Sequence, residues 1–379
     1  MQTHVFWTAT VVAITGCSSA VPVGDQEQTM PTAFALAAGY SIDAVPPLAT
    51  GARSFAYAIN DAGVVAGAAS KSPDSTSPVH AIRWTPGSAP KDLGLLPGGA
   101  ISSANAINAI NVVAGSANVT TVSAHGFVYV DPGPMKDIGW LPLGGLTPAF
   151  QNISANGIND RQQIVGVSPL QLGAPTFSAP MRAFLWEAGT ISDLGSIDGG
   201  SSAAFAINAQ GAVTGSSSTN GGTHAALWSG GTIQDLGSCT GANQARGTAI
   251  NAVGHVAGTC FFPQVNGYPN GHPEFRRAFF YTAEGGILEL GTLGGRKSEA
   301  FGVDASDTVV GKADVVTTSS SVVAHAFAWT QSGGMKDLNT LISSPGWVLL
   351  EARAINAKGQ IAGLGTLNGV ARGFVLTPK

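Results

Sequence analysis

The stretch Ser202–Gly215, SAAFAINAQGAVTG, carries a motif that recurs along the whole chain. The motif is Ala-Ile-Asn or a close variant, and adjacent copies lie 48, 51, 49, 43, 53 and 52 residues apart. A period of this size is typical of a propeller, a solenoid or an array of small units. The seven copies are Ala58-Ile59-Asn60, Ala106-Ile107-Asn108, Gly157-Ile158-Asn159, Ala206-Ile207-Asn208, Ala249-Ile250-Asn251, Gly302-Val303-Asp304 and Ala354-Ile355-Asn356.

Small residues alternate with larger ones along the strand that carries this motif. Two and four residues before the Asn (Asp304 in the sixth copy) the side chain is always Ala or Gly, and directly before it stands Ile or Val. Side chains of a strand alternate between its faces, so one face is uniformly small. Such a face suits a strand that crowds against its siblings, and we predict that this is the innermost strand of each blade.

A turn of the form Asn-x-x-Gly follows the strand. Six of the seven residues at the fourth turn position tolerate a left-handed backbone, and Gln162 is the exception, where we expect a locally different turn. We interpret the repeated Asn as a cap of its own turn and not as a catalytic residue. The residues at this position are Gly63, Asn111, Gln162, Gly211, Gly254, Asp307 and Gly359.

The second strand of each unit centres on a β-branched residue and is expected to end at a Gly two residues later. Variable loops follow this Gly. The β-branched residues are Val65, Val113, Ile164, Val213, Val256, Val309 and Ile361. The expected strand ends are Gly67, Gly115, Gly166, Gly215, Gly258, Gly311 and Gly363.

The third strand has the idealised form His/Arg-Ala-Phe-x-Trp, and its aromatic side chains are predicted to fill the space between neighbouring blades. A metal site built from the His residues is one interpretation. A structural role is favoured, because equivalent positions on different blades lie apart and Arg replaces His freely. The strands begin at His80, His125, Arg182, His224, Arg277, His325 and Arg372.

The fourth strand carries Asp-Leu-Gly or a variant, and it follows six of the seven third strands. The chain ends just past the seventh third strand, whereas Tyr40–Val45 precedes the first motif by a similar distance. This N-terminal segment can supply the missing strand. We therefore predict an all-β fold: a seven-bladed β-propeller of four-stranded blades, closed by an N-terminal strand that completes the last blade.

The ordered pattern of these motifs resembles the bacterial extracellular HAF-repeat family. The closest stretches are His325–Leu338, Glu289–Gly295 and Ser202–Gly215, and the resemblance covers about residues 40 to 377. It implies an exported protein with a propeller-like fold. The family supplies no established activity and no catalytic residues.

The N-terminus resembles an export signal. Val5–Ile14 is an apolar run too short to span a bilayer, and Ile14-Thr15-Gly16-Cys17 resembles the lipobox of bacterial lipoproteins, in which Cys17 would carry the lipid. We expect a signal peptide at 1–17, a flexible tether at 18–38 and the propeller at 39–379. The alternative is a plain secretory signal. The expected location is the outer membrane or cell surface, or otherwise the periplasm or the medium.

Composition excludes several classes of function. Charged residues make up 11% of the chain, the net charge is −4 and no polybasic tract is present, so nucleic-acid binding is not expected. Gly-x-Ser-x-Gly, His-Glu-x-x-His and a P-loop are absent from the sequence. We expect no cofactor and no metal site, a membrane contact through the lipid anchor alone, and a monomer.

The loop Thr259–Arg276 is the candidate ligand or partner site. Its aromatic, His, Glu and Arg side chains suit stacking on a sugar or clamping a peptide, although the loop could instead bury these rings against its own blade. Cys239 and Cys260 lie on one predicted face, and we expect a disulfide rather than two buried thiols. The candidate residues are Phe261, Phe262, Tyr268, His272, Glu274, Phe275 and Arg276.

Three functions remain open on these grounds. We favour a non-enzymatic binding propeller that recognises a protein or a glycan through variable loops on one face. The alternative is an exported polysaccharide hydrolase or lyase, which convergence of Asp198, Glu299 or Glu351 in a central pocket would favour. The third possibility is purely structural packing in the envelope.

Overall fold

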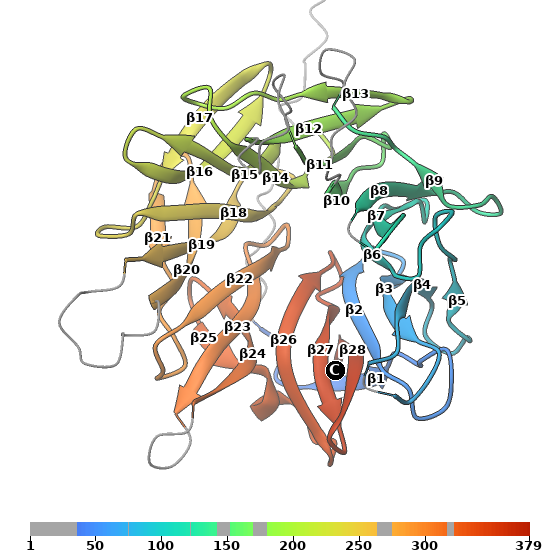
Figure 1. Cartoon of the computed structure of the whole chain (residues 1–379). Helices are drawn as coiled ribbons and strands as arrows, with labels where there is room; N and C mark the ends of the chain where they lie inside the picture. Colours follow the sequence, from blue (N-terminus) through green and yellow to red (C-terminus); the bar gives the residue numbers. More distant parts are fainter. Residues whose placement is uncertain are drawn as a thin grey trace, which may run out of the picture. The chain divides into compact units, whose positions relative to one another are not determined.

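The repeats form four-stranded antiparallel sheets in the computed structural model of the chain (Figure 1). The structure describes residues 36–74, 76–121, 123–141, 152–169, 180–263, 275–316 and 322–379. All of them belong to one compact unit, Ala33–Lys379. Cys17 and the predicted signal peptide lie outside the described residues.

The strands of each repeat take four successive places in its sheet. The first strands are β2 (Ser54–Ile59), β6 (Ser102–Ile107), β10 (Ser154–Ile158), β14 (Ser202–Ile207), β18 (Gln244–Ile250), β22 (Ser298–Val303) and β26 (Trp347–Ile355). The second strands are β3 (Val65–Ser70), β7 (Val113–Asn118), β11 (Ile164–Pro169), β15 (Val213–Thr219), β19 (Val256–Phe262), β23 (Val309–Val316) and β27 (Ile361–Leu367).

The third strands are β4 (Val79–Trp84), β8 (Ala124–Tyr129), β12 (Met181–Glu187), β16 (Gly222–Ser229), β20 (Phe275–Thr282), β24 (Val322–Thr330) and β28 (Val370–Pro378). The fourth strands are β5 (Lys91–Asp92), β9 (Lys136–Asp137), β13 (Thr190–Asp193), β17 (Thr232–Gly237), β21 (Gly286–Glu289) and β25 (Gly334–Asp337). A short 3-10 helix, η2 (Leu338–Leu341), follows β25.

The N-terminal strand β1 (Tyr40–Ala44) takes the fourth place in the sheet of the last repeat. It pairs antiparallel with β28, with Ile42 opposite Leu376, and gives the order β1-β28-β27-β26. Leu36, which the sequence places in the tether, packs against the same core as Leu376. The described residues also hold one eight-stranded sheet, because a single parallel pair, Thr223 with Gln244, joins the sheets of two adjacent repeats.

The arrangement is that of a β-propeller, with the first strands facing a common centre and the fourth strands outside (Figure 1). The prediction that the Ala-Ile-Asn strand is innermost is therefore confirmed. The core lies between successive sheets: one buried cluster contains Ala66 and Ala81 of the first repeat beside Ala104 and Phe127 of the second. The Phe side chains of the third strands, Phe127, Phe184, Phe279, Phe327 and Phe374, are fully buried.

The Asn of the repeated motif, or Asp304 in the sixth copy, is called the ring residue below. Every first strand contains a β-bulge at the residue three positions before its ring residue. In β2, Ala56 lies opposite Gly67 and Ala58 opposite Ala66, so Tyr57 is the extra residue. A bulge bends the strand and redirects a side chain. The equivalent register shifts occur in β6, β10, β14, β18, β22 and β26.

The Gly of the second strand faces this bulge and does not end the strand, so that prediction was wrong. β3 continues to Ser70, three residues beyond Gly67. A Cβ at Gly67 would lie 2.0 Å from the carbonyl oxygen of Phe55, and at the equivalent glycines the distances run from 1.8 to 2.2 Å. Only glycine fits this close approach of two backbones.

The repeated Asn caps its own turn and also contacts the next repeat. The Oδ1 atom of Asn60 accepts hydrogen bonds from the backbone N–H groups of Ala62 at 3.1 Å and Val64 at 3.0 Å, which confirms the predicted cap. Its Nδ2 group donates to the carbonyl oxygen of Asn108 at 2.9 Å. The same bond joins Asn108 to Asn159, Asn159 to Asn208, Asn208 to Asn251, Asn251 to Asp304 and Asn356 to Asn60.

This series of amide contacts has a gap at the sixth repeat. Asp304 accepts from the Nδ2 group of Asn251 through its carbonyl oxygen, but its carboxylate offers no N–H group to the carbonyl oxygen of Asn356. Asn356 in turn donates to the carbonyl oxygen of Asn60 at 2.9 Å. The last repeat therefore contacts the first.

The turn at Gln162 does not differ from the others, contrary to the prediction. Gln162 adopts φ 60°, close to the 66° of Asn111 and the 63° of Asp307. The Asn159 Oδ1 cap is also formed there, with the backbone N–H group of Arg161 as a donor at 3.1 Å. The cap and the strand pairing hold the glutamine in a left-handed conformation that it does not prefer.

The His or Arg and Asp motifs form a cross-strand pair in five of the repeats. The Nδ1 atom of His125 lies 2.6 Å from the Asp137 carboxylate, and His325 lies at the same distance from Asp337. Arg182 takes the same place, with its Nε atom 3.5 Å from Asp193. This pairing explains why Arg can replace His, and it fits the structural role.

In Asp304→Asn an amide would occupy the gap in the ring. Its Oδ1 atom keeps the bonds from the N–H groups of Ser306 and Thr308, and its Nδ2 group gains the carbonyl oxygen of Asn356. We expect the free energy of unfolding to rise by about 1 kcal/mol, the usual net contribution of one hydrogen bond. Chemical denaturation measures this change.

The gain should depend on pH. Burial raises the pKa of Asp304, so the contribution of its carboxyl to stability is complete below the unfolded-state pKa and is lost as the pH rises through the folded-state pKa. The advantage of the variant is therefore larger near neutral pH than in acid. Asp160→Asn is the control, because it removes an exposed carboxylate from the same type of turn. Equal gains for both variants would contradict the account.

Gln162→Gly removes the side chain from a left-handed position. The conformation costs a non-glycine residue about 1–2 kcal/mol, part of which the extra freedom of glycine in the unfolded chain offsets. We expect the free energy of unfolding to rise by about 0.5–1 kcal/mol. Gln210→Gly, at an exposed turn position without a positive φ, should lower it by a similar amount. A loss of stability in Gln162→Gly would refute the proposed strain.

Candidate functional site

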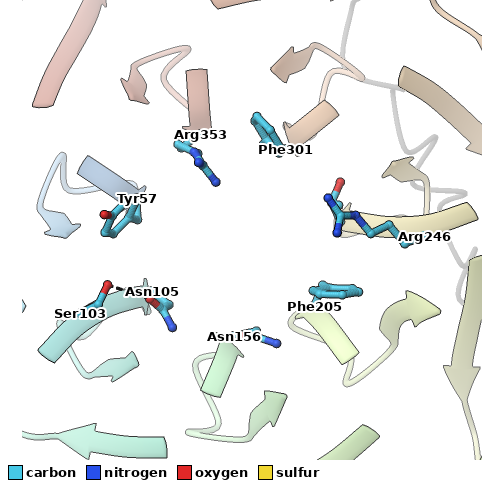
Figure 2. A pocket seen from close by; sticks show the side chains of 9 residues that line it. Tyr57, Ser103, Asn105, Asn156, Phe205, Arg246, Phe301 and Arg353 are labelled. Carbon is cyan, nitrogen blue, oxygen red and sulfur yellow. Dashed lines mark hydrogen bonds between the residues drawn. The ribbon is translucent and has the colours of Figure 1, made fainter. Parts of the chain in front are cut away.

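The bulged residues of the seven first strands line a central cavity of about 360 Å³. Figure 2 shows their side chains pointing into one shared space from strands of successive repeats. The bulge is what aims them, because it adds one residue to a strand whose neighbours pack between the sheets. The lining residues are Tyr57, Ser103, Asn105, Asn156, Phe205, Arg246, Thr248, Phe301 and Arg353.

Cations and aromatic rings make up one part of the lining. The guanidinium of Arg353 lies 4.6 Å from the ring centre of Phe301 and 6.0 Å from that of Tyr57. The guanidinium of Arg246 lies 5.7 Å from the ring centre of Phe205. These are cation–π distances, so the rings hold the arginines in place while leaving their N–H groups for other acceptors.

Amide and hydroxyl side chains of the lining tie the repeats together. Asn156 Nδ2 donates to the carbonyl oxygen of Ala204 at 2.9 Å, and Thr248 Oγ1 donates to that of Ala300 at 2.7 Å. Asn105 makes the same contact to the next repeat, at 3.0 Å. Three carbonyl groups of the wall are therefore already satisfied by side chains.

A buried glutamate lies beside the cavity within a group of cations. Glu299 is 5% exposed, and its carboxylate lies 3.0 Å from Arg276, 3.5 Å from Arg246 and 3.6 Å from Lys312. Burying a carboxylate is costly unless it is paired, and these three cations meet that condition.

Glu351 extends the group toward the cavity. Its carboxylate lies 2.9 Å from the Nζ atom of Lys312 and forms an ion pair with Arg353. Burial alone would raise the pKa of Glu351, but Arg353 and Lys312 outweigh it and hold the pKa below its usual value. Glu351 is therefore ionised at neutral pH.

Two of the lining groups keep their ordinary charge. Burial raises the pKa of Tyr57, so its hydroxyl stays protonated at neutral pH and can donate a hydrogen bond. Burial lowers the pKa of Arg246 from its high ordinary value, with Glu299 acting in the opposite direction. An arginine remains protonated under these conditions.

The residues of the predicted loop site separate into different surroundings. Phe261 and Arg276 are paired on β19 and β20, and the Phe261 ring centre lies 5.3 Å from the Arg276 guanidinium and 5.0 Å from that of Arg246. Phe262 packs against a buried cluster instead. The ring centre of Phe275 lies 6.0 Å from the guanidinium of Arg277. Tyr268, His272 and Glu274 lie outside the described residues.

Of the three carboxylates whose convergence in a central pocket would favour a hydrolase, two lie close together, but none of the three lines the central cavity. Glu299 and Glu351 both reach Lys312, whereas Asp198 lies elsewhere and accepts hydrogen bonds from Ser218 Oγ at 2.6 Å and the N–H group of Gly200 at 2.9 Å.

The structure joins Cys239 and Cys260 in a disulfide with their Cα atoms 5.9 Å apart. Within the described ranges no three His, Cys, Asp or Glu side chains form a group that could hold a metal ion. No helix there is both long and apolar enough to cross a membrane.

Sequence reasoning missed the cavity because it examined the constant positions of the repeat. The residue three before the ring Asn varies freely, from Tyr57 to Asn105 to Arg353. The signal was present in that variation, because a position that changes within an otherwise uniform strand is not fixed by the requirements of the scaffold. The bulge itself could not be foreseen, and only the bulge places this residue at the axis.

Comparison with known proteins gives distant structural similarity alone. No family model and no curated protein matches the chain. TolB from Acinetobacter baumannii shares 12% identity at a TM-score of 0.42, over 83% of this chain and 64% of that chain. An acylaminoacyl peptidase from Pyrococcus horikoshii shares 12% identity at a TM-score of 0.38, over 76% of this chain and 52% of that chain. The GH93 α-L-arabinofuranosidase of Fusarium graminearum, in complex with arabinobiose, shares 10% identity at a TM-score of 0.40, over 89% of this chain and 97% of that chain. Similarity at this level transfers neither activity nor ligand.

Glu351→Gln tests the charge network beside the cavity. Because the pKa of Glu351 is depressed in the folded state, its contribution to stability is present above its unfolded-state pKa and is lost as the pH falls through the folded-state value. We expect the variant to lose about 1–2 kcal/mol near neutral pH and less in acid. Glu187→Gln, at an exposed glutamate, should change stability by less than about 0.5 kcal/mol. A loss that is the same at both pH values would contradict the network.

Proposed function

We propose that the chain is an exported, non-enzymatic binding protein, built as a closed seven-bladed β-propeller, which takes a protein or glycan ligand in its central cavity. The observation that carries this proposal is the convergence of two arginines and three aromatic rings on one cavity at the axis. Ligand sites are typically lined by aromatic and apolar side chains together with a small number of convergent polar groups. We therefore place the proposed site at the bulged strands and not at the loop Thr259–Arg276 that the sequence suggested.

Closure is supported by contacts between the first and last repeats that match those between other neighbours. Asn356 donates to Asn60, as described above. The hydroxyl of Ser54 accepts from the N–H group of Gly373 and donates to the carbonyl oxygen of Val45. Ser202 makes the equivalent pair of bonds, to Ala183 and Gly195.

A shared core lies across the same junction. Val375 of the last repeat belongs to one buried cluster with Val65, Ile82 and Trp84 of the first. A solenoid would leave these apolar faces open at its two ends.

Binding is favoured over catalysis by the state of the carboxylates. A glycoside hydrolase needs one carboxylic acid with a raised pKa and a second, ionised carboxylate. Glu351 has a lowered pKa, and Glu299 is held by three cations. Glu351 is therefore not available as a proton donor at neutral pH.

A polysaccharide hydrolase or lyase remains the second candidate. It is favoured by one observation, the approach of Glu299 and Glu351 to the same lysine, Lys312. A ligand that displaced this lysine would bring the two carboxylates into a shared site.

Export, lipidation at Cys17, a surface or periplasmic location, a monomeric state and membership of the HAF-repeat family are parts of the same proposal. They rest on the sequence motifs described in the first subsection. A binding propeller suits a tethered protein that meets envelope or extracellular polymers.

The test is a glycan and peptide array probed with the full chain and with Arg246→Gln/Arg353→Gln. We expect a ligand that the wild type retains and the double variant loses by at least about tenfold in affinity, since each arginine can give charge-assisted hydrogen bonds. Arg161→Gln is the matched control, because Arg161 lies on a turn, where it contacts Ala209. Thermal denaturation confirms that each variant folds.

Two outcomes would overturn the proposal. A ligand that is kept by the cavity variant but lost by Phe262→Ala/Phe275→Ala would place the site at the strand ends. Release of shortened glycan from a captured polysaccharide, abolished by Glu299→Gln, would establish the hydrolase or lyase instead.

A further inference from the structure

The lining of the central cavity has charges of one sign only. Arg246 and Arg353 are both part of it, and the other lining residues are uncharged Tyr, Ser, Asn, Phe and Thr side chains. Glu299 and Glu351 contact the arginines from beside the cavity and are not among its lining residues. The surface that a ligand meets is therefore cationic.

The surrounding charge network does not cancel this cationic character. Among the described residues, three cations, Arg246, Lys312 and Arg353, contact the two carboxylates of Glu299 and Glu351. A surplus of positive charge in a partly buried site attracts an anion more strongly than it would on the surface.

The arginines also retain unused hydrogen-bond donors. The Nε atoms of Arg246 and Arg353 are buried and have no acceptor in the described part of the chain. Within the described residues the guanidinium of Arg246 reaches a carboxylate only at the long distance of 3.5 Å, that of Glu299. A planar guanidinium with free N–H groups is suited to a carboxylate, which it binds through two parallel hydrogen bonds.

The remaining lining suits a sugar ring better than a peptide. Phe205, Phe301 and Tyr57 offer apolar surface for the ring carbons, and Asn156 offers a polar side chain for hydroxyl groups. A peptide would need free backbone groups in the wall, but the carbonyl oxygens there accept hydrogen bonds from Asn105 and its equivalents. The cavity volume of about 360 Å³ is at the small end of the range for ligand pockets.

We propose that the central cavity binds a uronic acid residue of an acidic polysaccharide, with Arg246 and Arg353 on its carboxylate and the aromatic rings against its sugar ring. This inference rests on the proposed function and narrows it to one ligand class. The carboxylate lies on the cationic side of the cavity, and the hydroxyl groups face the amides of Asn105 and Asn156.

The experiment is a calorimetric titration of the full chain with uronic acid oligosaccharides and with the same oligosaccharides after reduction of their carboxyl groups to alcohols. We expect the acidic forms to bind at least about tenfold more tightly, and their affinity to fall with added salt. Arg353→Gln should remove most of this difference, whereas Arg353→Lys should restore part of it, and Arg161→Gln should change nothing.

The outcomes separate this inference from the proposed function. Equal binding of the acidic and reduced forms, lost in Arg353→Gln, would overturn the uronic acid while leaving the cavity as a binding site. Binding of peptides with a free C-terminal carboxylate, but of no oligosaccharide, would overturn the sugar and keep the arginine site. Uronic acid binding that is unchanged in Arg246→Gln/Arg353→Gln would overturn both.

Discussion

One side-chain amide in each of six repeats, with Asp304 at the same place in the seventh, holds the inner strands of this protein together. The Oδ1 atom of each ring Asn closes the turn of its own repeat, and the Nδ2 group reaches the backbone of the next, as Asn60 does to Asn108. Both ends of the amide are buried and satisfied, so replacing it would leave unpaired groups in two repeats at once. Local turn geometry and contact between repeats thus depend on the same residue.

The bulge in each first strand divides the repeat into constant and variable positions. Ala56 and Ala58 mark positions that are Ala or Gly in every repeat and pack closely between strands. Gly67 leaves room for the displaced backbone of the bulge. Tyr57, the extra residue, faces the axis. The seven equivalents differ in chemistry, so a uniform scaffold presents an asymmetric cavity with its cations near Phe301 and its amides opposite.

The fold was largely predictable from the sequence, whereas the site was not. The period, the small face of the first strand and the His–Asp motifs are local patterns, and they predicted four-stranded units and the strand Tyr40–Ala44 in the last sheet. The bulge has no sequence signature of its own. Without it Gly67 looked like a strand end, Phe261 looked like a loop residue, and the left-handed backbone of Gln162 contradicted its propensity.

A crystal structure that resolves the amide and carboxylate side chains is the most direct test of this account. It should show the Nδ2 group of Asn356 within hydrogen-bond distance of the Asn60 carbonyl oxygen, the interruption at Asp304, and the side chains of Tyr57 and Arg353 next to each other in the lining of one axial cavity. First and last repeats that stand apart, or bulged residues that point between the sheets, would contradict it.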